Sequence, residues 1–142
     1  MENDDKKDLN LMNRLHNCTN HYQGKYKRVL CVCSAGLLRS PTAAWVLSNE
    51  PYNFNTRACG SDGSYALFPL DIVHLTWADQ IVCMSKEQEA KVTEMLKNVF
   101  QGESKEVVCL NIPDKFSYRD PELVEMIKKA YNDVDIMRKA NA

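Results

Sequence analysis

Apolar and polar residues follow one another along the chain in blocks that predict alternating strands and helices. Four short runs rich in apolar and β-branched side chains predict strands at 28–33, 54–58, 80–84 and 106–110. Four longer segments with apolar residues at helical spacing predict helices at 40–49, 69–77, 86–100 and 121–138. Regular alternation of this kind is typical of an α/β fold with a parallel sheet.

The predicted architecture is a three-layer α/β fold, in which a four-stranded parallel sheet is flanked by helices. The first run, at 28–33, is apolar at nearly every position, as expected for a strand buried on both faces. Ligand sites in such sheets gather at the carboxyl ends of the strands. Cys33 stands at one of these ends, so the residues that follow it are candidates for a ligand site.

Length and composition favour a single domain. The 142 residues are enough for one hydrophobic core, which we place in an α/β domain over 28–142. Residues 1–27 form an N-terminal extension whose first eight residues are mostly charged, and we expect it to be partly mobile. The oligomeric state is not predicted.

Charge and hydropathy narrow the expected partners and location. A net charge of −1 with interspersed signs gives no electrostatic case for a nucleic-acid or membrane partner. No signal-like apolar region and no membrane-length run stands out, so we expect a cytoplasmic, or at least intracellular, protein. Several of the six cysteines lie in apolar runs, which predicts reduced thiols. His16, Cys18 and His21 lie close in sequence without a fourth ligand, so no metal site is predicted.

Residues 33–41, with the sequence C-S-A-G-L-L-R-S-P, connect the first strand to the first helix. Backbone N–H groups of a short loop at a helix start can surround an anion, and the helix dipole favours negative charge there. The same field favours the thiolate form of Cys33, while the Arg39 guanidinium can grip two phosphate oxygens. Ser40 and Pro41 predict an N-cap and a first-turn proline. The predicted phosphate-binding residues of the loop are Ser34, Ala35, Gly36, Leu37, Leu38 and Arg39.

The loop resembles the phosphate loop of low-molecular-weight protein tyrosine phosphatases, which has the pattern C-x-x-N-x-C-R-S-P. Residues 112–124, I-P-D-K-F-S-Y-R-D-P-E-L-V, are similar to a late segment of a shorter subgroup of predicted tyrosine phosphatases. The two motifs are about 80 residues apart in the expected order, which is more specific than either alone. Residues 57–62 and 77–84 also fit the family, so the resemblance covers roughly residues 28–135.

The resemblance implies a phosphomonoester hydrolase, and more narrowly a protein tyrosine phosphatase, that works through a phosphocysteine intermediate. Cys33 would be the nucleophile, which splits one difficult displacement into two easier ones. Arg39 would hold phosphoryl oxygens in a bidentate fork that lysine cannot form. Ser40 would donate a hydrogen bond to the Cys33 thiolate as well as cap the helix. The implied partner is a phosphotyrosine protein or a small aryl phosphate, and no cofactor is implied.

Two aspartates compete for the role of general acid. Asp114 matches the acidic residue of the late motif, whereas Asp120 precedes a proline, as the acid does in the larger family. The Asp120-Pro121-Glu122 run is more simply an N-cap, a first-turn proline and an acidic first turn, so we favour Asp114. Phe116 and Tyr118 alternate beside Asp114 and are predicted to wall the pocket against an aromatic ring, although packing of that segment is nearly as good an interpretation.

The chain departs from the family pattern at positions that affect the loop. Gly36 stands where the family usually has an asparagine that braces the loop, so the loop is expected to be less preorganised. Leu38 stands where the larger family has a second cysteine that protects the nucleophile as a disulfide. Cys59 could substitute if it approaches Cys33, but we favour its interpretation as a small buried residue.

Two other functions stay open at this point. An arsenate reductase-like thiol enzyme shares the loop and fold, but it needs a relay of further cysteines. Cys83 lies in a predicted strand without a nearby second cysteine, so no relay is visible. A non-catalytic phosphate-binding module would be expected to lose the nucleophile or the acid, and this chain keeps candidates for both.

Overall fold

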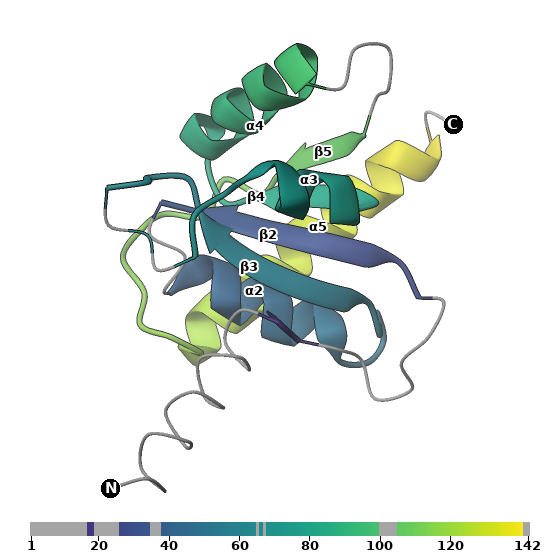
Figure 1. The fold of residues 1–142 in the computed structure, drawn as a ribbon. Helices are drawn as coiled ribbons and strands as arrows, with labels where there is room; N and C mark the ends of the chain where they lie inside the picture. Colours follow the sequence, from purple (N-terminus) through teal and green to yellow (C-terminus); the bar gives the residue numbers. More distant parts are fainter. Residues whose placement is uncertain are drawn as a thin grey trace, which may run out of the picture.

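The computed structural model describes residues 17–18, 26–34, 38–64, 66, 68–99 and 105–140. Its centre is a five-stranded sheet in the order β1-β3-β2-β4-β5 (Figure 1). The four strands that lie parallel to one another are β2 (Arg28–Cys33), β3 (Asn55–Gly60), β4 (Gln80–Cys83) and β5 (Glu106–Cys109). These confirm the predicted parallel sheet. A two-residue strand that was not predicted, β1 (Asn17–Cys18), pairs antiparallel with β3 at the edge.

Helices cover both faces of the sheet, which confirms the three-layer prediction (Figure 1). On one face, α2 (Arg39–Ser48) and α5 (Pro121–Ala140) supply buried residues to the larger hydrophobic core. On the other face, α3 (Ile72–Trp77) and α4 (Lys86–Val99) supply buried residues to a second, smaller core.

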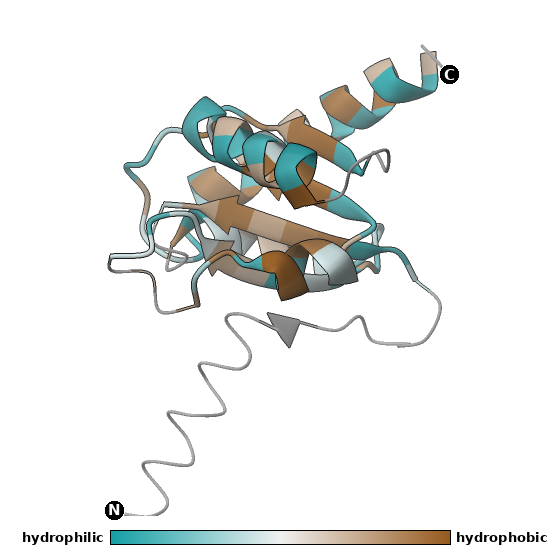
Figure 2. Cartoon of the chain, turned by 45° about the horizontal axis from the view of Figure 1, so that its top comes forward, coloured by the Kyte–Doolittle hydropathy of each residue, from teal (hydrophilic) through white to brown (hydrophobic). Residues whose placement is uncertain are grey.

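The side chains of β2 alternate between the two cores. Val29, Cys31 and Cys33 belong to the core beneath α2 and α5, whereas Leu30 and Val32 belong to the core beneath α3 and α4. All five are buried, because the strand lies in the interior of the sheet with a helical layer on each side. Hydrophobic residues accordingly concentrate in the strands, while α4 shows a hydrophilic outer side (Figure 2).

The predicted helix at 69–77 is wrong at its start. Pro69 forms a bridge with Gly60, and the Leu70 N–H donates to the Gly60 carbonyl at 2.8 Å, so this segment continues extended from the sheet. The helix begins only at Ile72, where Asp71 accepts a hydrogen bond from the His74 N–H at 2.9 Å as its N-cap. The other predicted boundaries lie within about two residues of the observed ones.

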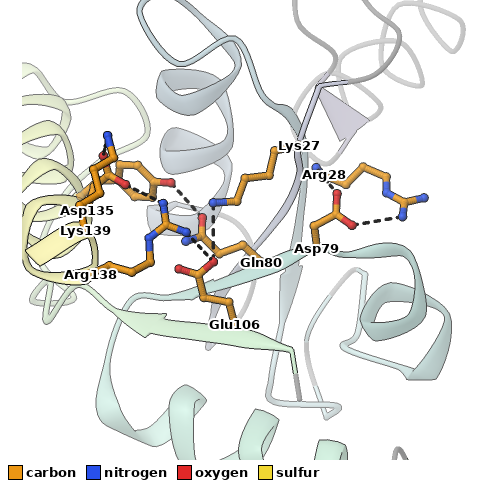
Figure 3. Close-up of polar contacts among 9 residues, drawn as sticks. Lys27, Arg28, Asp79, Gln80, Glu106, Asp135, Arg138 and Lys139 are labelled. Carbon is orange, nitrogen blue, oxygen red and sulfur yellow. Dashed lines mark hydrogen bonds and ion pairs between the residues drawn. The ribbon is translucent and has the colours of Figure 1, made fainter. Parts of the chain in front are cut away.

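Charged side chains gather where the parallel strands begin, and we call this group the amino-end cluster: Lys27, Glu106, Asp135, Arg138 and Lys139 (Figure 3). Glu106 lies 3.0 Å from Arg138 and 3.7 Å from Lys27. Arg138 also contacts Asp135 at 2.8 Å, and Lys139 reaches the same carboxylate at 3.1 Å. Hydrogen bonds from Lys139 and Arg138 hold the pKa of Asp135 below its usual value. The cluster therefore joins the start of β5 to the last turn of α5.

Two further polar pairs lie at the same end of the sheet. The Tyr131 hydroxyl donates to the side-chain oxygen of Gln80 at 2.9 Å, and Gln80 is fully buried. Asp79 accepts bonds from the backbone N–H and the guanidinium of Arg28, at 2.9 and 3.2 Å (Figure 3). Partial burial acts to raise the pKa of Asp79, but the bonds from Arg28 outweigh it and hold that pKa below its usual value. Both pairs tie the first residues of strands to their surroundings.

Parts of the predicted extension lie outside the described residues. Of residues 1–25, the structure describes only the short strand Asn17–Cys18, so the predicted mobility of the extension stays a prediction. Within the described ranges, no three His, Cys, Asp or Glu side chains group in a way that could hold a metal ion. The helices described here also include none that combines the length and apolar character needed to cross a membrane.

Candidate active site

The predicted phosphate loop lies at the carboxyl end of the sheet, between β2 and α2. Cys33 is the last residue of β2 and Arg39 is the first residue of α2, and their side chains are 3% and 4% exposed. Ser34 and Leu38 lie at the two ends of the loop. Residues 35–37 lie outside the described residues, so the phosphate contacts predicted for Ala35, Gly36 and Leu37 stay predictions.

Ser40 brings a hydroxyl to the Cys33 sulfur. The Ser40 Oγ lies 3.0 Å from the Cys33 Sγ, and it also lies 3.3 Å from the carbonyl oxygen of Cys59. A serine hydroxyl has one proton, so it donates to one of these partners at a time. While Cys33 is a thiol, its S–H can donate to Ser40; once it ionises, the hydroxyl can turn and donate to the sulfur. This geometry fits the predicted support of a thiolate.

The predicted N-cap role of Ser40 is wrong. The helix begins one residue earlier, at Arg39, and Leu38 occupies the N-cap position without a side-chain hydrogen bond. Ser40 lies inside the first turn, and its hydroxyl contacts Cys33 and Cys59 rather than the N–H groups of the helix. Thr42, one turn after Leu38, donates its hydroxyl to the Leu38 carbonyl at 2.8 Å. The α2 amino end is therefore fixed without a conventional cap and still faces the loop.

Arg39 connects the loop to the segment that follows β5. Its Nη1 donates to the Ile112 carbonyl at 2.9 Å, and its Nε lies 3.5 Å from the Asp114 carboxylate. Arg39 is nearly fully buried, whereas 64% of the Asp114 side chain is exposed. The structure thus brings together two residues that the sequence analysis took from separate motifs.

The two candidate acids have different surroundings. Asp120 accepts a hydrogen bond from the Glu122 N–H at 2.9 Å, and its own carbonyl accepts from Val124, so it caps α5 as predicted. Asp114 contacts Arg39 and lines a pocket. Between the two, only Asp114 borders that pocket, so the geometry agrees with the choice of Asp114 over Asp120.

A pocket of about 390 Å³ opens beside these groups. Ser34 and Arg39 reach it from the loop and α2, and Asp114 from the segment after β5. Its full described lining is Ser34, Arg39, Ser85, Lys86, Glu87, Ile112, Pro113 and Asp114. Ser34 and Arg39 are the described loop residues predicted to bind phosphate that line this pocket, whereas Leu38 and the nucleophile Cys33 are not part of the lining. The pocket therefore has the position and the cationic group that an anionic ligand requires.

Sequence analysis missed the residues that follow β4. Ser85, Lys86 and Glu87 line the pocket, and the neighbouring Gln88 is buried and bonds to Ser34 at 3.1 Å. These residues come directly after a predicted parallel strand, where ligand sites are expected. That position is the signal available in the sequence, and it indicates Ser85 to Gln88 as well as Cys33 and Asp114.

Phe116 and Tyr118 do not line the described pocket. Phe116 is 5% exposed and belongs to the core with α2 and α5, which favours the packing interpretation. Tyr118 contacts the guanidinium of Arg119, 5.0 Å from its ring centre, and the same guanidinium lies 4.2 Å from the ring centre of Trp45. Binding of a substrate ring by Phe116 or Tyr118 stays a prediction.

Among the other cysteines of the sheet, Cys31 shares the core of Cys33, whereas Cys59 and Cys83 do not. Cys59 and Cys83 belong to the core beneath α3 and α4, on the opposite face from Cys33. Burial raises the pKa of both thiols. The expectation that Cys83 has no cysteine near it is wrong, because Cys109 lies in register with it on β5. Since the cores place Cys33 across the sheet from Cys83, this pair does not give Cys33 a relay.

Comparisons with known proteins agree on the fold. No family model and no curated protein matches the chain. Among solved structures, the YwlE arginine phosphatase from Geobacillus stearothermophilus is similar over 83% of this chain and 98% of its own, with a TM-score of 0.53 and 19% identity. YfkJ from Bacillus subtilis is similar over 84% of this chain and 98% of its own, with a TM-score of 0.57 and 16% identity. The chain therefore has the same α/β fold as these proteins.

Proposed function

We propose that this protein is a phosphomonoester hydrolase that uses Cys33 as its nucleophile. The observation that carries the proposal is the junction of two distant segments: a buried Arg39 beside Cys33 contacts Asp114 at a pocket of suitable size. A guanidinium, a thiol with a hydroxyl at 3.0 Å and an exposed carboxylate are the groups that a two-step phosphoryl transfer needs. The resemblance of both motifs to low-molecular-weight tyrosine phosphatases supports the same reaction.

In the first step, the Cys33 thiolate attacks phosphorus and forms a sulfur–phosphorus bond as the bond to the leaving oxygen breaks. Asp114 gives its proton to that oxygen, so the alcohol or phenol leaves neutral. In the second step, the Asp114 carboxylate takes a proton from water, and the water oxygen attacks phosphorus. The sulfur–phosphorus bond breaks, which releases phosphate and restores the thiolate. Arg39 stabilises the negative oxygens in both steps.

The proposed substrate class is phosphotyrosine in proteins, or a small aryl phosphate. The motif resemblance supports this choice, and so does an exposed carboxylate, Asp114, in the lining of the pocket. One protein of similar fold is an arginine phosphatase. Peptides with phosphotyrosine, phosphoserine or phosphoarginine should therefore be compared directly, and we expect phosphotyrosine to be hydrolysed fastest.

Hydrolysis of p-nitrophenyl phosphate in the presence of a chelator tests the reaction. The intact protein should release p-nitrophenol, and Cys33→Ser should abolish that release. Cys109→Ser is a matched control, since Cys109 is the partly exposed cysteine of β5 and lies outside the described pocket lining. A phosphate adduct on Cys33, trapped by rapid acid quench and located by mass spectrometry, would establish the intermediate.

Two results would contradict the proposal. If the intact protein binds phosphate but releases no p-nitrophenol above background, it is a phosphate-binding module. If arsenate instead drives oxidation of its thiols, it belongs with the arsenate reductase-like enzymes.

A further inference from the structure

Gln88 is a buried glutamine whose two amide ends are both used. It lies in the first turn of α4 and is 1% exposed. Its Oε1 accepts hydrogen bonds from the backbone N–H of Ser85, at 2.8 Å, and from the Ser85 hydroxyl. A backbone N–H can only donate, so the oxygen of the amide must face Ser85 and the nitrogen must face the other way. The nitrogen donates to the Ser34 hydroxyl at 3.1 Å.

Ser34 is the first residue of the loop after Cys33, and it is held on several sides. Its carbonyl accepts from the Asp62 N–H at 2.9 Å, while the Cys33 carbonyl accepts from the Ser61 N–H at 2.8 Å. These two bonds attach the backbone of the loop to the segment that follows β3. The bond from Gln88 attaches the Ser34 side chain to α4, from the opposite direction along the sheet order.

A loop that surrounds a phosphate works best when its N–H groups are fixed before the ligand arrives. Gly36 has no side chain that could hold the loop from within. An amide buried as deeply as that of Gln88 costs free energy unless it is hydrogen-bonded, and here it bonds to the loop itself. Burial of the Gln88 amide is therefore compensated only while Ser34 stays in the position that accepts this hydrogen bond.

We propose that Gln88 is a positioning residue, which holds Ser34 and thereby preorganises the Cys33 loop for a phosphoryl group. The inference rests on the proposed function, because it assigns Gln88 to that same site. Gln88 is not among the described residues that line the pocket. It acts through Ser34, so its removal should weaken phosphate binding and turnover together without unfolding the protein.

Gln88→Met tests this, because methionine has nearly the same length and shape but cannot form any of the three hydrogen bonds of the Gln88 amide. Gln80→Met is a matched control, since Gln80 is equally buried and bonds to Tyr131 at the other end of the sheet. The main readout is alkylation of Cys33 by iodoacetamide, followed by mass spectrometry, as inorganic phosphate is added. Thermal unfolding measures stability in parallel, and kcat and KM are measured with p-nitrophenyl phosphate.

For Gln88→Met, we expect the phosphate concentration that half-protects Cys33 to rise about tenfold, and kcat/KM to fall by a similar factor. Gln80→Met should change both by less than about twofold. Ser34→Ala removes the same bond from the other side and should resemble Gln88→Met. In the Ser34→Ala background, Gln88→Met should then add less than it does alone, because the bond to Ser34 is already absent and only the bonds to Ser85 are left to lose.

The inference is overturned if a folded Gln88→Met protein keeps wild-type phosphate protection and kcat/KM. Should Gln88→Met fail to fold, unchanged protection in Ser34→Ala overturns it instead. These outcomes differ from failure of the proposed function, which would appear as a wild-type Cys33 that phosphate does not protect. That result would remove the site, and the role of Gln88 with it.

Discussion

Both ends of the sheet carry charged side chains, but the charges are paired differently at the two ends. At the amino end, Glu106 pairs with Lys27 and Arg138, and Arg138 pairs again with Asp135. At the carboxyl end, Arg39 is 4% exposed, and its described partners are one backbone carbonyl and a carboxylate 3.5 Å away. A guanidinium has five N–H donors, so Arg39 has donors left for a ligand at the pocket.

This difference shows how a group of charged residues that stabilises the fold can be distinguished from one that binds a ligand. The two ends differ in burial, since Arg39 is 4% exposed and the side chains of the amino-end cluster are 24–72% exposed. They differ also in whether the charges are satisfied by one another. Changes at the carboxyl end should therefore reduce activity at little cost in stability, and changes at the amino end should do the reverse.

The largest expected effect is that of Arg39→Lys. Lysine keeps the charge but loses the planar fork, so kcat/KM for p-nitrophenyl phosphate should fall about 1,000-fold. The matched change Arg138→Lys, in the amino-end cluster, should leave kcat/KM within about twofold of wild type. Equal losses of kcat/KM in the two variants would show that the different pairing of charges at the two ends does not determine activity.

Next in size is Asp114→Asn, which removes the proposed acid while keeping the shape of the side chain. We expect kcat to fall about 100-fold near neutral pH, because the leaving oxygen must depart unprotonated. Asp120→Asn is the control, since asparagine is also a good N-cap and should preserve the start of α5. If only the Asp120 change damages turnover, the assignment of the acid is reversed.

Tyr131→Phe should affect stability rather than activity. It removes the hydroxyl that donates to the buried Gln80 side-chain oxygen at 2.9 Å. A buried acceptor left without this donor should lower the free energy of unfolding by about 1–2 kcal/mol, measured by urea denaturation. Turnover of p-nitrophenyl phosphate should stay at the wild-type rate, and a clear loss of turnover would show that the two ends are coupled.

The smallest expected effect is a pH dependence at the amino end. The pKa of Asp79 is lowered in the folded protein, so its carboxylate stabilises the fold at neutral pH, and this contribution is lost as pH falls through the folded-state pKa. Asp79→Asn should cost less than about 1 kcal/mol at pH 7, because both Asp79 and Arg28 are nearly half exposed. Urea denaturation at pH 7 and pH 3 should show that the difference from wild type shrinks at the lower pH. A constant difference would exclude ionisation as its cause.

Much of the fold could be predicted because its signals are local. The apolar run at 28–33 and the alternation of strands and helices depend only on neighbouring residues, and the parallel sheet followed from them. The strand Asn17–Cys18 has two residues and exists only through its partner β3, so no local pattern indicated it. The start of α3 depends likewise on the bridge between Gly60 and Pro69. This bridge pairs the end of β3 with a loop residue, so no local pattern of apolar residues indicated it.

The residues of the candidate site also fall into those that a local motif indicates and those that only the tertiary structure brings in. Cys33, Arg39 and Asp114 were found because each lies in a motif with its own spacing. The part played by Ser85 and Gln88 depends on β4 lying beside β2, a neighbour relation that follows from the order of strands and not from their sequence. The capping role of Ser40 was wrong for a related reason, since its hydroxyl faces Cys33 and a carbonyl of β3.

The alternation of side chains in the sheet has a consequence for how this protein would survive oxidation. Cys33 faces the α2 and α5 layer, and Cys59 faces the α3 and α4 layer, so the backbone of the sheet separates the two sulfurs. A sulfenic acid formed at Cys33 would therefore face the same layer as Cys31 and not that of Cys59. Without Cys59, its repair would depend on Cys31 or on a small thiol supplied by the surroundings.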